Sequence, residues 1–331
     1  MSKKEFLANT IDTLGGYGLV RRVNRWSGLV VLNYHRIGVH GDSLFDWGLW
    51  SAGLEDFEQQ VRYLSLNFDV IGERDLPDLF KRKSGRYVMI TFDDGYRDNY
   101  ELAYPILRSY NVPAQFFLAT GFLDQPKVSW WDEIAWMVRS SRKNQLPHNA
   151  WTRAEIDFDE PDRERAIVKL LKTFKSLAAA ETEEYLGALA DLTGSGRCSS
   201  GLASDMWMTW DMVREMSQHM GIGGHTVSHN ILGQLTPPEQ EVEIKHCKER
   251  IETEIGRPIT TFSFPVGHQK AFNEFTREYL KRYGYRWAFS FYGGYAKLNH
   301  ADPLDIPRAA VESYIRLPEF QATVTLPQLY A

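Results

Sequence analysis

The stretch "RYVMITFDDG" (86–95) joins an apolar run to two adjacent acids and a glycine. The run is rich in Val, Ile and aromatic residues, which is typical of a strand buried on both faces. Asp93 and Asp94 follow it directly, so we expect them at the carboxyl end of that strand, which is the active side of a parallel α/β fold. Gly95 allows the backbone to turn sharply. A helix cap or an ion-paired turn is the alternative interpretation of this short motif.

Strand-like and helix-like stretches alternate along most of the chain. This alternation predicts a parallel sheet flanked by helices, which is an α/β fold. The number of units favours a barrel, with an open sheet as the alternative. The predicted strands are 29–35, 86–92, 113–120, 221–225, 259–265, 285–291 and 304–311, and the predicted helices are 99–111, 210–219, 236–256 and 271–283.

The region from about 124 to 205 departs from this alternation. It carries helix-forming stretches, of which 162–192 is the longest, with no strand pattern between them. We therefore interpret it as a helical insertion in a barrel that spans 29–311. An N-terminal helical segment, 1–28, precedes the barrel, and a C-terminal tail, 312–331, follows it.

Composition indicates a globular chain of 331 residues, with 43% hydrophobic residues and a formal net charge of -5. Acids and bases are mixed without a basic block, which argues against nucleic acid as a partner. Cys198 and Cys247 are the only cysteines, too few for a disulfide framework or a cysteine-rich zinc site. Free thiols fit a reducing compartment. No apolar run has the length of a transmembrane helix or the form of a signal peptide, so we expect a cytoplasmic location.

The N-terminal segment, 1–28, begins with basic residues and then spaces its apolar residues loosely, like one face of a helix. Packing of that face on the protein's own body is the favoured interpretation. A peripheral contact with a membrane surface is the alternative, which would place the protein at the inner face of the membrane. The sequence does not predict an oligomeric state.

Two histidines stand in "GGHTVSHNIL" (223–232), after a predicted strand. On a helical turn, the spacing of His225 and His229 places both imidazoles on one face, where they can share one metal ion. A lone histidine is more often a satisfied core or surface residue than a ligand. Two histidines at this spacing, directly after a Gly-Gly strand end, favour a metal site.

The acid pair and the histidine pair reinforce each other. Two histidines and one carboxylate leave positions open for water and substrate, as a catalytic metal requires. The remaining carboxylate could then take a proton from the attacking water. Zinc suits these ligands best, and cobalt, nickel, iron or manganese stay open as the divalent metal.

A third strand end carries the loop "FSFPVG" (262–267). Pro265 and Gly267 shape this loop, and its backbone N–H groups could face an oxyanion. Taken alone, the motif is better explained as an ordinary turn from a strand to a helix.

His35 ends the first predicted strand, in "LNYHRIG" (32–38). If the barrel closes, His35 and Asp93 lie on the same rim, and His35 could then serve as a general acid. A histidine buried in the core is the alternative, at about equal weight.

In this order, and at the ends of successive strands, "TFDDG", "HTVSH" and "FPVG" resemble the motifs of the polysaccharide deacetylase family. This family, which is defined by NodB homology, comprises metal-dependent carbohydrate esterases. The resemblance spans 29–311 apart from the helical insertion. It implies a distorted (β/α)7-type barrel.

The resemblance also implies roles for individual residues. Asp93 matches the catalytic base, and the backbone N–H of Val266 matches a group that holds the oxyanion together with the metal. The implied reaction removes the N-acetyl group of an amino sugar by attack of water on the acetamide carbonyl. The implied metal ligands are Asp94, His225 and His229.

The sequence departs from the commoner family pattern in two places. Many members carry an arginine in the third motif that pairs with the base, and Ser263 stands at that place here. Many also carry a Leu-x-His motif with the general acid near the C-terminus, which this chain lacks. The opening "YHR" (34–36) resembles the subgroup that deacetylates bacterial exopolysaccharides such as poly-N-acetylglucosamine, in which His35 would be the acid. Arg308, in "IPR", is our candidate for the missing arginine.

Three hypotheses about function stay open. The first is a metal-dependent N-deacetylase of an N-acetylated glycan or its lipid-linked precursor. The second is a barrel metal hydrolase of a small-molecule amide, ester or phosphoester, and the third is an inactive glycan-binding relative. Four tryptophans flank the insertion and could stack on sugar rings or pack in the core: Trp130, Trp131, Trp207 and Trp210.

Overall fold

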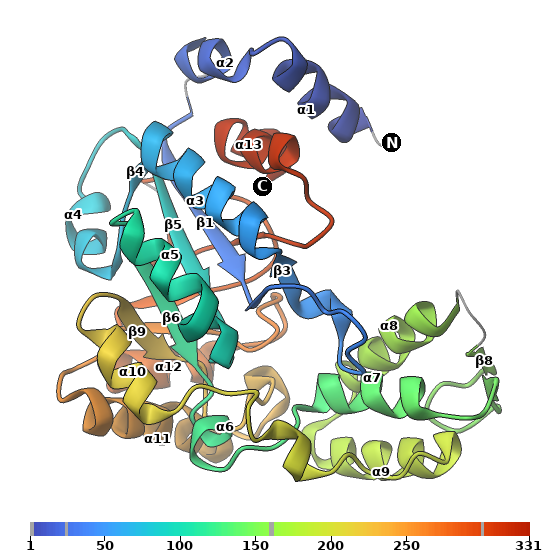
Figure 1. Ribbon diagram of the computed structural model, residues 1–331. Coiled ribbons are helices and arrows are strands. Elements are labelled where there is room, and N and C mark those ends of the chain that lie inside the picture. Colours follow the sequence, from blue (N-terminus) through green and yellow to red (C-terminus); the bar gives the residue numbers. More distant parts are fainter. Residues whose placement is uncertain (1–2, 24–25, 159–161, 299–300) are drawn as a thin grey trace.

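A parallel sheet of eight strands forms the centre of the computed structural model, which describes residues 3–23, 26–158, 162–298 and 301–331 (Figure 1). The strand order is β11-β10-β9-β6-β5-β1-β12, and β4 adds to β5. The strands are β1 (Gly28–Tyr34), β4 (Asp69–Val70), β5 (Arg86–Phe92), β6 (Ala114–Leu118), β9 (Gly221–Gly224), β10 (Thr261–Ser263), β11 (Trp287–Phe289) and β12 (Ala309–Ala310).

The segment that leads into β12 curls the sheet towards closure. Ile306 pairs in parallel with Phe289 of β11, and Ala309 pairs with Leu32 of β1, so this segment bridges the two ends of the sheet. The prediction of an α/β fold with a distorted (β/α)7-type barrel is confirmed. The strand predicted over 304–311 is regular only at its end, because Pro307 has no N–H to donate to a ladder.

Helices cover the outside of the barrel between the strands (Figure 1). The longest, α11, begins after Thr236 with Pro237 at its first position, and it ends at Gly256, whose φ is 67°. Its buried face includes Ile244, Cys247 and Ile251. The barrel helices are α3 (Leu54–Asn67), α4 (Leu76–Leu79), α5 (Tyr104–Ser109), α6 (Thr120–Asp124), α10 (Trp210–Ser217), α11 (Pro237–Ile255) and α12 (Glu274–Arg282).

Several short elements complete the connections. β2 (Arg36–Ile37) pairs with β3 (Trp50–Ala52) beyond the end of β1, and a loop between them reaches the rim of the barrel. The π-helical turn η3 (Asn99–Ala103) precedes α5. The remaining short helices are η1 (Trp47–Leu49), η2 (Glu73–Asp75), η4 (Ala179–Glu181), η5 (Ser200–Ala203) and η6 (Leu232–Gln234).

Three helices, α7 (Trp130–Ser140), α8 (Asp162–Phe174) and α9 (Thr182–Thr193), project from one side of the barrel (Figure 1). They lie within the region expected to be a helical insertion. That region was expected to contain no strand, which is wrong, because β7 (Gln145–Leu146) and β8 (Ile156–Asp157) form an antiparallel pair between α7 and α8. Strands of two residues are too short to show an alternating pattern.

The two ends of the chain pack together. α1 (Lys3–Thr13) and α2 (Tyr17–Val23) contact α13 (Leu317–Thr325), and α14 (Pro327–Tyr330) follows α13. The segment 312–331 is therefore largely helical. None of the helices in the described ranges combines the length and the apolar character needed to cross a bilayer.

Candidate active site and metal centre

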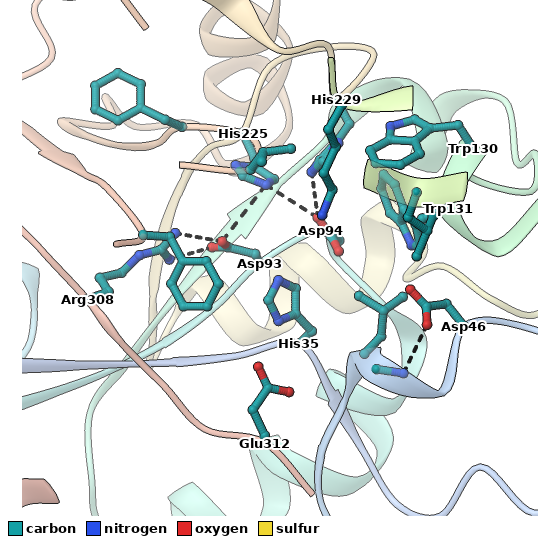
Figure 2. Close-up of a pocket in the computed structure, with 17 residues that line it drawn as sticks. His35, Asp46, Asp93, Asp94, Trp130, Trp131, His225, His229, Arg308 and Glu312 are labelled. Atoms are coloured by element: carbon teal, nitrogen blue, oxygen red, sulfur yellow. Dashed lines mark hydrogen bonds and ion pairs between the residues drawn. The ribbon is translucent and has the colours of Figure 1, made fainter. Parts of the chain in front are cut away.

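The acid pair lies where β5 ends, and its two side chains share His225 but differ in their other partners (Figure 2). The Asp93 N–H donates to the Tyr34 carbonyl at 3.0 Å, which extends the pairing with β1 by one residue. Asp94 then adopts a φ of 76°, and the backbone leaves the sheet. Both carboxylates are buried. Both carboxylates lie in one cavity, where Nε2 of His225 is 3.9 Å from Oδ2 of Asp93 and 3.3 Å from Oδ1 of Asp94.

Asp93 and Arg308 form a bidentate ion pair. The Arg308 nitrogens Nη1 and Nη2 donate to Oδ1 and Oδ2 of Asp93, each at 2.8 Å. Burial by itself raises the pKa of Asp93, but the Arg308 guanidinium together with the His225 and His35 imidazoles outweighs burial, and the net pKa is lowered. Asp93 is therefore a carboxylate, able to accept a proton.

Arg308 has no exposed surface, and its donors are satisfied by several strands. Nη2 donates to Ser263 Oγ at 2.8 Å, Nη1 donates to Asn33 Oδ1 at 2.6 Å, and Nε donates to the Ser290 carbonyl at 3.1 Å. A buried cation is tolerated only when it is paired and hydrogen-bonded in this way. The structure thus places Arg308 beside Ser263, the position at which the sequence departs from the family pattern.

Asp94, His225 and His229 converge as a possible ligand triad. The Nε2 atoms of both imidazoles lie 3.3 Å from Oδ1 of Asp94, and one atom from each residue lies within 4.8 Å of the others. Within the described residues, Oδ1 of Asp94 has no hydrogen-bond partner although it is buried. Ligands at about 2.0–2.1 Å from a tetrahedral zinc lie about 3.3 Å apart. The three residues therefore fit a small divalent cation.

The triad residues titrate under one another's influence. Burial raises the pKa of Asp94, but the nearby His225 and His229 imidazoles, together with His35, outweigh burial and the net pKa is lowered. Burial lowers the pKa of both imidazoles. For His225, the Asp93 and Asp94 carboxylates outweigh the effect of burial, and its pKa is raised. For His229, the effect of burial is larger than that of the carboxylates, and its pKa is lowered. The three groups thus supply a carboxylate and two imidazoles, which is a donor set typical of zinc sites.

The loop that carries the histidines is not a helical turn, so that expectation is wrong. Thr226 and His229 have φ values of 67° and 55°, which belong to the left-handed region. Glu243 of α11 stabilises this loop, because its Oε2 accepts from the N–H groups of Val227 and Ser228 at 2.8 Å each. The imidazoles converge because of this clamp, not because of helical periodicity.

Backbone strain gathers at the site. Within the described residues, six non-glycine residues have positive φ, and four of them lie here. Such conformations cost about 1–3 kcal/mol each and persist only where the surroundings enforce them, typically at functional sites. The four are Asp94, Thr226, His229 and Val266.

Different contacts orient the two imidazoles. Nδ1 of His225 donates to the Ser263 carbonyl at 2.8 Å, which leaves the Nε2 lone pair directed at the triad. Nδ1 of His229 has no hydrogen-bond partner in the described part of the chain, and its ring packs edge-on against Trp131 at 4.4 Å between centroids. Trp131 is held in turn, because its Nε1 donates to Tyr96 Oη at 2.8 Å. The inserted helix α7 thus supports one candidate ligand.

Replacing Glu243 with Ala is expected to weaken metal binding by about 10–100-fold, because outer contacts that orient ligands typically have this effect. The loop would lose the acceptor for two backbone N–H groups, so His229 would no longer be held in the triad. Titration of the purified protein with zinc, in competition with a chromophoric chelator, measures the change. Glu249→Ala, at an exposed position of the same helix, is the matched control. An unchanged affinity in Glu243→Ala would contradict the role of the clamp.

His35 lies on the same cavity as the acid pair (Figure 2). Its backbone is held on both sides: its N–H donates to Ser51 Oγ at 3.0 Å, and its carbonyl accepts from Asn99 Nδ2 at 2.6 Å. Burial lowers the pKa of the imidazole, and the carboxylates of Asp94 and Asp93 oppose this effect without cancelling it. The ring is therefore placed across the cavity from the candidate metal ligands, where a proton donor could act.

The loop 265–267 contributes one lining residue, Val266. Its φ of 61° is unusual for a β-branched side chain, and its N–H makes no backbone hydrogen bond in the described residues. Pro265 and Gly267 do not line the cavity but close the turn, since the Gly267 N–H donates to the Pro265 carbonyl at 2.7 Å. Gly267 has no space for a side chain, because a Cβ would lie 2.6 Å from Cβ of Phe291.

The structure separates the four tryptophans that flank the insertion. Trp131 and Trp207 are buried in the core, and Trp210 donates to Asp124 on the surface. Trp130 and Trp131 both line the cavity, and Trp130 stacks on Phe174 of α8 at 4.1 Å. The insertion therefore forms one wall of the cavity.

Sequence reasoning missed several residues of the site. Glu243 has no local signal, because its partners lie 15 and 16 positions away. Two rim carboxylates, Asp46 and Glu312, were also missed; burial raises the pKa of Glu312 to about 7. Asn33 could have been found, because a polar side chain inside the apolar run "LVVLNYH" indicates a buried hydrogen-bond partner.

Comparisons with known proteins agree with this geometry. The family model described as polysaccharide deacetylase matches residues 80–288. YxkH of Bacillus subtilis, provisionally named a polysaccharide deacetylase, is 22% identical over 263 residues, which cover 78% of this chain and 62% of YxkH. The poly-beta-1,6-N-acetyl-D-glucosamine N-deacetylase of Staphylococcus aureus is 30% identical over 122 residues, which cover 32% of this chain and 41% of that enzyme. The chain thus spans less than two thirds of either relative.

Solved structures share the fold. The deacetylase PplD of Streptococcus pyogenes, in complex with acetate, has a TM-score of 0.60 at 17% identity, over 91% of this chain and 99% of that chain. IcaB from Ammonifex degensii has a TM-score of 0.56 at 18% identity, over 92% and 98% of the two chains. At this level of identity the likeness concerns the fold alone.

Proposed function

Because this chain belongs to the polysaccharide deacetylase family, which acts on N-acetylated polysaccharides, we propose that it is a metal-dependent N-deacetylase. Its substrate would be the N-acetylated amino sugar of a bacterial polysaccharide or of its lipid-linked precursor. One observation carries the proposal. Adjacent carboxylates open into one cavity, with Asp93 paired to Arg308 and Asp94 placed against His225 and His229.

An exopolysaccharide of N-acetylglucosamine is the substrate class that we favour. The similarity to a poly-beta-1,6-N-acetyl-D-glucosamine N-deacetylase supports it, as does the position of His35 at the end of β1 rather than near the C-terminus. A small-molecule amide or ester stays the second candidate, and an inactive glycan-binding relative the third. The cytoplasmic location expected from the sequence stays a prediction.

The proposed roles divide the reaction between two sides of the cavity. A divalent metal held by Asp94, His225 and His229 would act as a Lewis acid on the acetamide carbonyl and would increase the acidity of water. Asp93 would accept the proton of the attacking water, since Arg308 keeps it ionised. Arg308 itself would hold the carboxylate in place through both oxygens.

The backbone and the opposite rim would complete the reaction. The Val266 N–H would donate to the oxyanion that develops on the acetyl carbonyl, because Val266 lines the cavity and its N–H has no backbone acceptor among the described residues. His35 would donate a proton to the amine that leaves as the carbon–nitrogen bond breaks. The products are acetate and a free amino sugar.

Acetate release from defined substrates tests the function. The protein is purified, its metal content is measured, and it is offered oligomers of N-acetylglucosamine, lipid-linked oligosaccharides and small acetamides and esters. We expect zinc-dependent acetate release from the oligosaccharides. Release from only the small molecules would support the second candidate. Glycan binding without release from any substrate, at full metal occupancy, would favour an inactive relative.

Replacing His35 with Ala is expected to lower kcat for amide substrates by about 10²-fold, because the leaving amine would lack its proton donor. The loss should be smaller for 4-nitrophenyl acetate, whose leaving group departs without protonation. Rates on both substrates are compared with those of His246→Ala, which removes an exposed histidine of α11. Full amide activity in His35→Ala would refute the proposed acid.

A further inference from the structure

The helices α1 and α2 present an apolar face to solvent. Phe6 is 61% exposed, Leu14 is 78% exposed and Leu19 is 66% exposed. Leu7 and Val23 are exposed as well. Isolated exposed leucines are ordinary on protein surfaces, but a cluster of large apolar side chains on adjoining helices marks an interaction site.

The exposed residues share one side of each helix. On α1, Phe6 and Leu7 are exposed near its start. Leu14 directly follows the end of α1 and continues its hydrogen bonding by one residue, because its N–H donates to the Thr10 carbonyl at 3.2 Å, so it lies beyond Phe6 and Leu7 on the same side. On α2, Leu19 and Val23 stand four residues apart and share a face in the same way. Both helices contact α13, and these five side chains are exposed.

The opposite side of these helices packs on the protein's own body. Ala8 and Tyr17 form a buried cluster with Ala322 of α13. The Tyr17 hydroxyl donates to the Pro318 carbonyl at 2.6 Å, which ties α2 to the start of α13. The two interpretations of the N-terminal segment therefore concern different faces: one packs on the protein's own body, and the other has no assigned partner.

Charge distinguishes the partners that could cover the outer face. Residues 4–23 carry three basic and two acidic side chains, although the whole chain has a formal net charge of -5. One of the basic side chains, Arg21, donates to the Tyr63 hydroxyl at 2.9 Å. The acids, Glu5 and Asp12, stand seven residues apart and therefore line one flank of α1, away from the apolar stripe. Lys4 and Arg22 are exposed beside the stripe. A second copy of this face would bring like charges together, whereas an anionic surface complements them.

We propose that the outer face of α1, α2 and the turn between them, defined by Phe6, Leu7, Leu14, Leu19 and Val23, docks on an anionic membrane surface. The apolar side chains enter the boundary between headgroups and acyl chains, and the basic side chains contact lipid phosphates. Neither helix spans the bilayer, so the contact is peripheral and reversible. The proposal does not depend on the chemistry at the barrel rim.

Sedimentation with vesicles tests the proposal on the full chain. We expect the protein to sediment with vesicles of phosphatidylglycerol and phosphatidylcholine, less with phosphatidylcholine alone, and less at high salt. The double variant Leu14→Ser/Leu19→Ser should bind about tenfold more weakly or worse, because two apolar side chains would no longer be buried. The double variant Leu66→Ser/Val168→Ser is the matched control, since Leu66 is 72% exposed on α3 and Val168 is 65% exposed on α8.

Three results would overturn the proposal. They are no sedimentation with anionic vesicles, equal binding by the two double variants, and a dimer in solution that Leu14→Ser/Leu19→Ser abolishes. Acetate release from soluble oligosaccharides is measured in the same samples. A protein that binds vesicles without releasing acetate would contradict the proposed function but not the membrane contact. A protein that releases acetate without binding vesicles would contradict the membrane contact but not the proposed function.

Discussion

Asp93→Asn is expected to lower kcat for acetate release by about 10⁴-fold, at the upper end of what loss of a general base costs. The amide has the shape of the carboxylate but cannot accept the proton of the attacking water. Metal affinity should stay close to that of the unaltered protein, because Asp93 faces Arg308 and lies outside the ligand triad. Steady-state acetate release and zinc titration are measured on the same preparation.

Asp94→Asn is the paired control, because it makes the same replacement of a carboxylate by an amide at the neighbouring acid. We expect this variant to lose affinity for zinc, and activity as a consequence. The two variants therefore separate a base from a ligand at adjacent positions. Normal acetate release by Asp93→Asn, or loss of zinc from it comparable to that of Asp94→Asn, would contradict the division of roles between the two acids.

The acidity of Asp93 predicts the direction of the pH dependence. Its pKa is lowered in the folded protein, because Arg308, with His225 and His35, outweighs the effect of burial. A base with a lowered pKa stays ionised as the pH falls, so Asp93 should not limit activity at mildly acidic pH. Any loss of rate in that range should come from protonation of the imidazoles, which compete with the metal for the same nitrogen atoms.

The sequence predicted the acid pair well because its signal is local. Residues 86–92 form β5 with the predicted boundaries, since an apolar β-branched run can satisfy its backbone only by pairing inside a sheet. A polar residue that directly follows such a run must lie at the carboxyl end of the strand, on that rim of the barrel. The positions of Asp93, Asp94 and His35 all follow from this rule.

The histidine loop shows where local rules stop. The spacing of His225 and His229 predicted that their imidazoles lie close together, as they do, but predicted the wrong conformation. Glu243, from another element, holds the loop in which Thr226 and His229 have positive φ. Helical periodicity and a clamped loop both bring residues four apart together. The sequence alone cannot separate these two solutions, since the clamp exists only after α11 has packed against β9.

Arg308 lies further beyond sequence patterns, because it reaches Asp93 across 215 positions. Its candidacy came from the absence of an arginine at Ser263, and the barrel brings both residues to one carboxylate. The contact depends on the segment that links β11 to β1, which is irregular at Pro307. Closure of the sheet, and not a motif, therefore determines which cation serves the buried acid.

Arg308→Met is expected to lower the free energy of unfolding by about 3–5 kcal/mol at neutral pH, because it leaves the buried Asp93 carboxylate without its cation. The metal site should be intact in the fraction that folds, so zinc affinity separates local damage from unfolding. Urea unfolding of the metal-free protein, followed by tryptophan fluorescence, measures the stability. Arg316→Met, at an exposed arginine that pairs with Glu319, is the matched control.

The double variant Arg308→Met/Asp93→Asn tests the cause of this loss. If the penalty arises from an unpaired carboxylate, the neutral amide should restore much of the stability and none of the activity. The sign of the pH effect gives a second check. In the unaltered protein the lowered pKa of Asp93 stabilises the fold above the unfolded pKa, and this contribution is lost as the pH falls through the folded value. In Arg308→Met, burial alone would raise that pKa, so the defect should shrink as the pH falls and the carboxyl becomes neutral. A defect that is the same at all pH values, and that the second substitution does not relieve, would show that Arg308 acts through packing and not through charge.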